Sequence, residues 1–433
     1  MSLLLKNIRA VTLAPPSVEE CDIRIVDGEI AARSRHLKAQ HDDEVVDLQN
    51  KIVMPGFVCS HTHLYSALSR GMPTPKSLPG NFIEILQKIW WNLDEALDEE
   101  SIYHSALVGA IESVKFGTTT LIDHHASPNF IRGSLDLIKH AMRQARLRGV
   151  LCYETTDRGG KKRRDLGLEE NERFLTENAS NSHFRGTIGA HAPFTLSDDS
   201  LKHLGELAGL YDSGVHIHVA EDNSDVLDSV KKHKIDIIER LEKFGILRKK
   251  SIFAHGVHLT RKHLAKVEKS GAWMIHNPRS NMNNAVGYAP LTWYGKHSAL
   301  GTDGFPSDMF EESKFGYFRN TESNHRTEFS RIPAMLQEGQ HLASEFFGRP
   351  FGTLKKGSPA DLVVLDYMPP TPLTSRNLYG HFLLGMNSTM VRDVIVDGHW
   401  VLRNRQLIGI DEEVVMQKAR KVAKKLWSRM HGR

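Results

Sequence analysis

The sequence is poor in cysteine, in long apolar runs and in charge of one sign. Its three cysteines, Cys21, Cys59 and Cys152, have no C-x-x-C spacing, so we expect no disulfide framework and no cysteine zinc site, and a cytoplasmic location fits. No uncharged apolar stretch reaches the roughly 18 residues of a membrane span, so no membrane partner is expected. A net charge of +4 over 433 residues is too weak a field to indicate nucleic acid. The expected partner is a small molecule.

The middle of the chain alternates short apolar runs with segments of helical period. The eight runs are 57–59, 120–122, 150–153, 186–189, 215–217, 252–254, 273–275 and 298–300. Eight strands with intervening helices predict an α/β fold, a (β/α)₈ TIM barrel over residues 56–349. Apolar residues at helical spacing predict helices over 99–115 and 225–244.

The two chain ends resemble each other. Arg24–Ile30 and Val394–Val401 each place Asp-Gly between short β-rich runs, the signal of a type I′ hairpin. We interpret residues 1–55 plus 350–410 as one small composite β-sandwich domain. The alternative is two unrelated hairpins that cap a larger domain. Residues 411–433 have the pattern of a basic amphipathic helix, which we expect to pack on the body rather than to bind a membrane or nucleic acid.

Potential metal ligands follow several predicted strands. His61 and His63 come after the first, His218 lies in the fifth, His255 follows the sixth and Asp303 the eighth. With 24 histidines in the chain, about 1.3 H-x-H triplets arise by chance, and His216-Ile217-His218 is a second one, so a triplet alone means little. The ordered set means more, because all these positions face one mouth of a barrel. Residues i and i+2 on a strand share a face, so His61 and His63 can bind one ion together.

Several motifs stand in order along nearly the whole chain: Pro55–His63, Gly117–Thr120 with Asp123, His216–His218 with Glu221, Ala254–Gly256, Asn277-Pro278 with Ser280-Asn281, Gly301–Gly304, and Gly357 with Ala360–Val363. In that order they resemble the amidohydrolase superfamily, in its chlorohydrolase and heterocyclic-amine deaminase branch. A second set of segments resembles most closely the SsnA-type aminohydrolases: Cys59–His61, Trp90–Asp94, Asp123–Pro128, Glu154–Arg158, Arg279–Asn284 and Ser307–Glu312. The superfamily usually has a lysine near Ser358-Pro359, and this small departure touches nothing catalytic.

The resemblance implies a barrel inside a composite β-sandwich and a divalent metal ion held by His61, His63, His218 and Asp303. It assigns Glu221 as proton shuttle and His255 as the residue that orients water. The end of the fourth strand, Gly189–Pro193, lacks the carboxylated lysine or glutamate that bridges two ions in dinuclear members, so one ion is expected. Three imidazoles and one carboxylate suit Zn²⁺ and Fe²⁺ about equally.

The predicted function is hydrolytic deamination of a small nitrogen heterocycle, a purine, pyrimidine, pterin or triazine-like ring, with Glu221, His255 and Asp303 as catalytic residues. His191 and Asp94 are assigned to substrate binding, although a helix-capping role suits Asp94 as well; Tyr65 and Arg158 are weaker candidates. Alternatives are a chlorohydrolase or cyclic amide hydrolase, and, in another class, a non-catalytic metal-binding accessory protein. A homo-oligomer, a dimer, is expected, although no sequence feature sets the oligomeric state.

Overall fold

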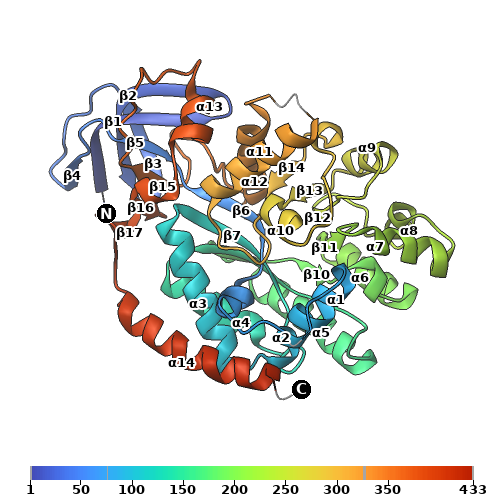
Figure 1. Cartoon of the computed structure of the whole chain (residues 1–433). Coiled ribbons are helices and arrows are strands. Elements are labelled where there is room, and N and C mark those ends of the chain that lie inside the picture. The colour runs from blue at the N-terminus through green and yellow to red at the C-terminus, as the bar shows by residue number, and fades with distance from the viewer. Residues whose placement is uncertain (1, 76, 325–327, 432–433) are drawn as a thin grey trace.

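The two chain ends form one mixed sheet in the computed structural model, which describes residues 2–431 except 76 and 325–327 (Figure 1). The sheet has nine strands in the order β18-β17-β16-β15-β5-β1-β2-β3, with β4 paired to β1. The strands are β1 Ser2–Leu13, β2 Pro16–Val26, β3 Glu29–Ser34, β4 Asp43–Asp47, β5 Ile52–Pro55, β15 Leu362–Leu365, β16 Val391–Val396, β17 His399–Arg403 and β18 Gln406–Leu407. Antiparallel pairing of β5 with β15 joins the two ends.

Both predicted hairpins are confirmed. Asp27 and Gly28 turn β2 into β3 with φ values of 48° and 80°, and Asp397 and Gly398 turn β16 into β17 with 50° and 75°. Two positive φ values in succession are what a type I′ turn requires, and glycine takes the second at no steric cost.

Two sheets of parallel strands occupy the middle of the chain, which establishes the α/β class. One has the order β6-β7-β8-β9 and the other β10-β11-β12-β13-β14. Their strands are β6 Phe57–Thr62, β7 Thr118–His125, β8 Arg148–Tyr153, β9 Phe184–Gly186, β10 Ile188–Ala190, β11 Val215–Val219, β12 Ile252–His255, β13 Trp273–His276 and β14 Ser298–Leu300. The predicted strand 186–189 is therefore divided at Thr187. Isolated parallel bridges, Thr62 to Asp303 and Thr155 to Ala190, connect the two sheets.

Helices follow most of the parallel strands. They are α1 Phe82–Ile85, α2 Trp91–Ala96, α3 Glu99–Lys115, α4 Ser134–Gln144, α5 Lys161–Glu177, α6 Asp198–Leu210, α7 Asn223–Asp228, α8 Ile237–Lys243, α9 Arg261–Ser270, α10 Pro278–Asn283, α11 Met309–Asn324, α12 Arg331–Phe347, α13 Leu378–Gly380 and α14 Glu412–His431. Short 3₁₀ and π turns are η1 Leu64–Ser69, η2 Leu86–Trp90, η3 Pro193–Thr195, η4 Ser229–His233, η5 Leu291–Trp293, η6 His381–Gly385 and η7 Ser388–Met390.

One predicted helix is confirmed and one is wrong. Helix α3 spans Glu99–Lys115 as expected, and Asp98 begins it with a capping box to Ser101. The helix expected over 225–244 is instead α7, η4 and α8. It is interrupted because Lys234 adopts a left-handed φ of 58° and Asp236 caps a new helix by accepting from two backbone amides.

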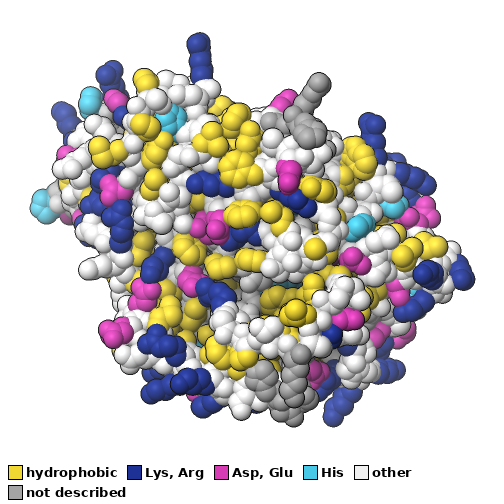
Figure 2. Space-filling view, viewed as in Figure 1, with side chains coloured by type: hydrophobic (Ala, Val, Ile, Leu, Met, Phe, Trp, Pro, Cys, Tyr) yellow, Lys and Arg dark blue, Asp and Glu magenta, His cyan; other side chains and the backbone are white. Residues whose placement is uncertain are grey.

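Helix α14 crosses the lower edge of the molecule in Figure 1, beside α3 and α2. Its apolar side is buried, with Val422 and Leu426 at most 3% exposed. The last two residues of the expected helix, 432 and 433, lie outside the described residues. On the face in Figure 2, acidic and basic side chains are interspersed. Among the described residues, no helix combines the length and apolar character needed to cross a bilayer.

Candidate metal centre and active site

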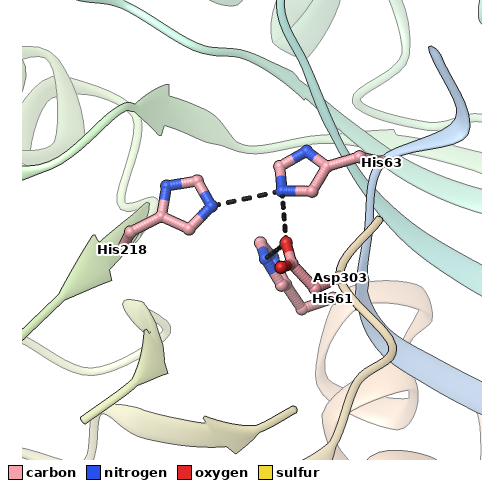
Figure 3. Close-up of side chains that lie close together, drawn as sticks. All are labelled: His61, His63, His218 and Asp303. Carbon is pink, nitrogen blue, oxygen red and sulfur yellow. Dashed lines mark hydrogen bonds and ion pairs between the residues drawn. The ribbon is translucent and has the colours of Figure 1, made fainter. Parts of the chain in front are cut away.

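Four side chains meet at the carboxyl ends of the parallel strands (Figure 3). The Nε2 of His63 lies 2.8 Å from Oδ1 of Asp303 and 3.2 Å from Nε2 of His218, and the Nε2 of His61 lies 3.4 Å from the same Asp303 oxygen. One ligand atom from each residue lies within 4.8 Å of the other three. The structure thus brings together all four sequence-predicted ligands, which come from β6 and the residue directly after it, from β11, and from the segment after β14.

Backbone hydrogen bonds explain why β6 and the segment after β14 meet here. The carbonyl of His61 accepts from the amides of Thr302 at 2.8 Å and Asp303 at 3.1 Å, and the amide of His63 donates to the carbonyl of Asp303 at 3.1 Å. Asp303 adopts a φ of 53°, unusual for a non-glycine residue. These bonds hold it there and turn its carboxylate toward the histidines.

The donor set fits a divalent metal ion. The Nε2 of His61 is buried and has no hydrogen-bond partner among the described residues, as expected of an atom that binds an ion. The Nδ1 atoms of His63 and His218 donate to the carbonyls of His124 and His191, at 2.6 and 2.7 Å, which leaves the Nε2 lone pairs facing the site. Three imidazoles with one carboxylate suit Zn²⁺ or Fe²⁺.

Glu221 and His255 lie beside these ligands. The Nε2 of His255 is 3.5 Å from Oε2 of Glu221, and ligand atoms of these two residues and Asp303 lie within 4.8 Å of one another. The Nδ1 of His255 is 2.8 Å from Oδ1 of Asn281, which can only accept, so His255 donates through Nδ1. Oε1 of Glu221 accepts from Asn284 at 3.1 Å.

The two carboxylates at this position have opposite electrostatic surroundings. Burial raises the pKa of Glu221 above its ordinary value. Burial acts in the same direction on Asp303, but its close contacts with the His61 and His63 rings outweigh it and hold the pKa of Asp303 well below its usual range. Near neutral pH, Asp303 is therefore an anion, while Glu221 is the carboxyl group that more readily carries a proton.

A cavity opens over this cluster, and aromatic rings form much of its wall. It is lined by Tyr65, Phe82, Trp90, Trp91 and Phe194, together with polar residues that include Asp94, Glu154, His191, Glu221, Asn284 and Asp303. Both predicted substrate-binding residues, His191 and Asp94, thus face the same cavity as His63, His218 and Asp303. Flat aromatic walls with a few polar groups are typical of sites for small ring compounds.

Asp94 is not a helix cap, which answers the alternative left open by the sequence. It lies within α2, is 2% exposed, and its Oδ2 accepts from Nη2 of Arg158 at 3.3 Å. Its Oδ1 has no partner among the described residues. Burial raises the pKa of Asp94 to about 7, although Arg158 opposes the shift.

Arg158 and His191, two further candidates for substrate binding, differ in how the protein holds them. Arg158 also donates to Glu154 at 2.7 Å and stacks on the Trp91 ring at 4.7 Å, so it is held by protein groups. His191 shares a hydrogen bond of 2.7 Å between its Nδ1 and the Thr195 hydroxyl, and burial lowers its pKa to about 3, so its ring is neutral.

Sequence reasoning missed several residues of the site. Glu154, which is 3% exposed, directly follows β8, so the strand-end rule that selected the histidines could have found it. Ser280 and Asn281 on α10, to which the sequence motifs assigned no role, and Asn284 directly after α10 contact Asp303, His255 and Glu221 respectively. Their spacing is helical, but only the fold reveals which acid or histidine each one meets.

Comparison with known proteins shows the family to which the chain belongs. The amidohydrolase family model matches residues 52–401, and the chain belongs to the amidohydrolase family. A 5'-deoxyadenosine deaminase of Methanocaldococcus jannaschii is 30% identical over 87% of this chain and 89% of its own. A 5-methylthioadenosine/S-adenosylhomocysteine deaminase of Thermococcus sibiricus is 29% identical, covering 93% and 94%.

Solved structures support the fold. An adenosine deaminase from Xanthomonas campestris with bound zinc superposes with a TM-score of 0.86 and 22% identity, covering 98% of each chain. The atrazine chlorohydrolase from Arthrobacter aurescens complexed with zinc has a TM-score of 0.81 at 19% identity, covering 97% of this chain and all of its own. At these identities the likeness concerns the fold alone.

Proposed function

We propose that the protein is a metal-dependent aminohydrolase that removes ammonia from a nitrogen heterocycle, and that its substrate carries an adenine-type ring. The observation that carries the proposal is the meeting of three histidines and Asp303 with Glu221 and His255 beneath a cavity with aromatic walls. The sequence left the kind of ring open. The similarity to deaminases named for adenosine compounds supports an adenine-type ring.

The architecture we propose is a closed (β/α)₈ barrel over 56–349, a composite β-sandwich of 1–55 and 350–410, and the helix 411–433. The bridges from Thr62 to Asp303 and from Thr155 to Ala190 support closure, because they link the edges of the two parallel sheets. A common apolar cluster supports the sandwich, since it contains residues of β1 and β2 together with residues of β15 to β17. The homodimer and the cytoplasmic location stay predictions.

We assign one divalent ion, Zn²⁺ or Fe²⁺, to His61, His63, His218 and Asp303. When bound, such an ion lowers the pKa of water toward neutrality and so supplies hydroxide near pH 7. A second trio, His124, Glu154 and His218, also places ligand atoms within 4.8 Å of one another. It shares His218, whose Nδ1 is committed to the His191 carbonyl, so only one nitrogen remains and the two sets exclude each other.

The chain's own residues then move the protons. The carboxylate of Asp303 accepts a proton from the attacking water, and the Nε2 lone pair of His255 orients that water because Nδ1 is bound to Asn281. Glu221, with its raised pKa, donates a proton to the ring nitrogen beside the carbon under attack. The proton held by Asp303 then passes to the amino group, which departs as ammonia, and the hydroxyl proton of the adduct returns to Glu221 as the ring carbonyl forms. Asp94 and His191 hold the substrate from the cavity wall.

An ammonia-release screen of the metal-loaded protein tests this function. We expect release from adenosine, 5'-deoxyadenosine or methylthioadenosine, with guanine, cytosine, a pterin and an aminotriazine as comparisons. Chloride release from a chlorotriazine without ammonia release from any amine would replace the proposal by a chlorohydrolase, and ring opening of a cyclic amide would replace it by an amide hydrolase. Metal binding without turnover of any of these compounds would favour the accessory protein.

A further inference from the structure

The three histidines of the metal centre differ in how their second nitrogen is held. His63 and His218 each donate from Nδ1 to a backbone carbonyl. The Nδ1 of His61 instead lies 2.8 Å from Nε2 of His216, another side chain. A backbone carbonyl is kept when its residue is substituted. The contact of His61, in contrast, is lost when the side chain of His216 is replaced.

The direction of the contact follows from the rest of the network. His61 presents Nε2 to the other ligands, so its proton is on Nδ1 and it donates to Nε2 of His216. The proton of His216 is then on Nδ1, which faces Sγ of Cys152 at 3.7 Å, a weak acceptor. All three side chains are 0% exposed, so no solvent can replace a lost partner.

The strand geometry places His216 for this contact. It lies on β11 two residues before His218, and alternate residues of a strand point to the same face. One strand thus offers a ligand at its carboxyl end and, one layer below, the side chain that holds a ligand from β6. The rings of His61 and His216 lie with their centroids 4.9 Å apart.

We propose that His216 is a positioning residue of the metal centre, which holds the His61 ring with Nε2 directed at the ion. The inference rests on the metal centre of the proposed function. His216 does not touch the ion or the substrate; it acts through His61. Removing such a hydrogen-bond partner typically lowers metal affinity about 10- to 100-fold, because the ligand ring loses its orientation and its preferred tautomer.

Two substitutions separate the hydrogen bond from the volume of the side chain. His216→Phe keeps a ring but removes the acceptor, and His216→Gln places an amide oxygen where Nε2 lies. Zn²⁺ affinity of the full chain, first stripped of metal, is measured by competition with a chromophoric chelator. We expect about 10- to 100-fold weaker Zn²⁺ binding for His216→Phe, with most of the affinity restored in His216→Gln.

The matched control is His276→Phe. His276 is a buried histidine on β13, and among the described residues its ring makes no hydrogen bond to any of the four ligands. We expect its Zn²⁺ affinity to be that of the wild type. Melting temperatures of the metal-free proteins check folding; if His216→Phe melts below His276→Phe, the smaller His216→Leu takes its place.

The possible outcomes separate this inference from the function on which it rests. Wild-type affinity in the Phe or Leu variant would overturn the role of His216 and leave the metal centre intact. Equal losses in Phe and Gln at unchanged metal-free melting temperature would overturn the hydrogen bond as the cause. Failure of the wild type to bind Zn²⁺ would overturn the metal centre and this inference together.

Discussion

In the proposed mechanism, Glu221 and Asp303 divide the proton chemistry because their surroundings differ. Both are carboxylic acids beside the same group of histidines. Burial raises the pKa of Glu221, whereas the close contacts of Asp303 with the His61 and His63 rings outweigh the effect of burial and lower the pKa of Asp303. Pairs of acids whose environments separate their pKa values are a recurring way to assign donor and acceptor in an active site.

Glu221→Gln tests the donor role. The amide keeps the size of the side chain and can still pair with Asn284, but it cannot transfer a proton. General acid–base groups contribute roughly 10²- to 10⁴-fold, so we expect kcat/KM to fall by at least that lower factor. Metal content and Tm, measured on the same preparation, should barely change. Near-normal turnover would refute the role, and loss of metal would identify Glu221 as a ligand.

His218→Ala tests the ligand set. Elemental analysis should find about one Zn or Fe per wild-type chain, and the variant should lose most of it because one ligand in four is gone. His191→Ala is the control, since His191 lines the cavity without belonging to the set. Two ions per wild-type chain would contradict the single-ion assignment.

The raised pKa of Asp94 predicts that substrate binding depends on pH. Burial raises its pKa to about 7, so its carboxylate is ionised above that pH and protonated below it. A carboxylate accepts hydrogen bonds from a substrate more strongly than a protonated acid does, so kcat/KM should fall as pH drops through about 7. In Asp94→Asn that dependence should flatten at a lower kcat/KM. An unchanged profile in the variant would exclude Asp94 as its source.

At the scale of elements, helix α14 supports the wall of the cavity from behind. Nε of Arg429 donates to the carbonyl of Ala96 at the end of α2, at 2.7 Å, and Nε1 of Trp427 donates to the carbonyl of Leu68 in η1, at 2.9 Å. On α2, Asn92 faces α14 through a bond to the Met430 carbonyl, and Asp94, two residues on and about 200° around the helix, faces the cavity.

Arg429→Ala should therefore impair substrate binding without touching the metal centre. Displacement of a binding group by about 1 Å can lower activity as much as 100-fold, and we expect KM to rise about 10-fold with a smaller change in kcat. The Tm should change little, because the ion pair of Arg429 with Asp98 is partly exposed. Arg420→Ala, on the exposed side of α14, is the control. An unchanged KM in Arg429→Ala would contradict the supporting role.

Local patterns predicted the elements well where one physical cause dominated. The run Thr120–Ile122 lies inside fully buried β7, and the capped, periodic segment 99–115 is one helix. Periodicity failed over 225–244 because apolar spacing continues through the break at Lys234. Strand ends likewise predicted the four candidate metal ligands. The partners on and directly after α10 and the contact between His216 and His61 depend on tertiary packing, which no local pattern encodes.

At the scale of the whole molecule, one buried arginine ties the terminal sheet to the parallel strands. Arg148 begins β8 and is 0% exposed; its Nε lies 2.8 Å from Asp361 and its Nη2 2.6 Å from Asp397. Asp361 precedes β15, and Asp397 lies in the turn after β16. A further bond joins the segments of the two acids, since the backbone amide of Asp397 donates to the carboxylate of Asp361 at 2.7 Å.

Arg148→Ala should destabilise the protein as a whole. It leaves Asp361 buried without its cation, and breaking a buried ion pair in this way typically costs about 3–5 kcal/mol. Denaturant unfolding followed by circular dichroism and tryptophan fluorescence measures the loss, with Arg403→Ala as control, because the Arg403–Glu44 pair is partly exposed and should contribute at most about 1 kcal/mol. Coincident transitions in the variant would mean that the terminal sheet and the parallel strands still unfold together. Two separated transitions would identify Arg148 as the residue that couples them, and unchanged stability would contradict its role as a tie.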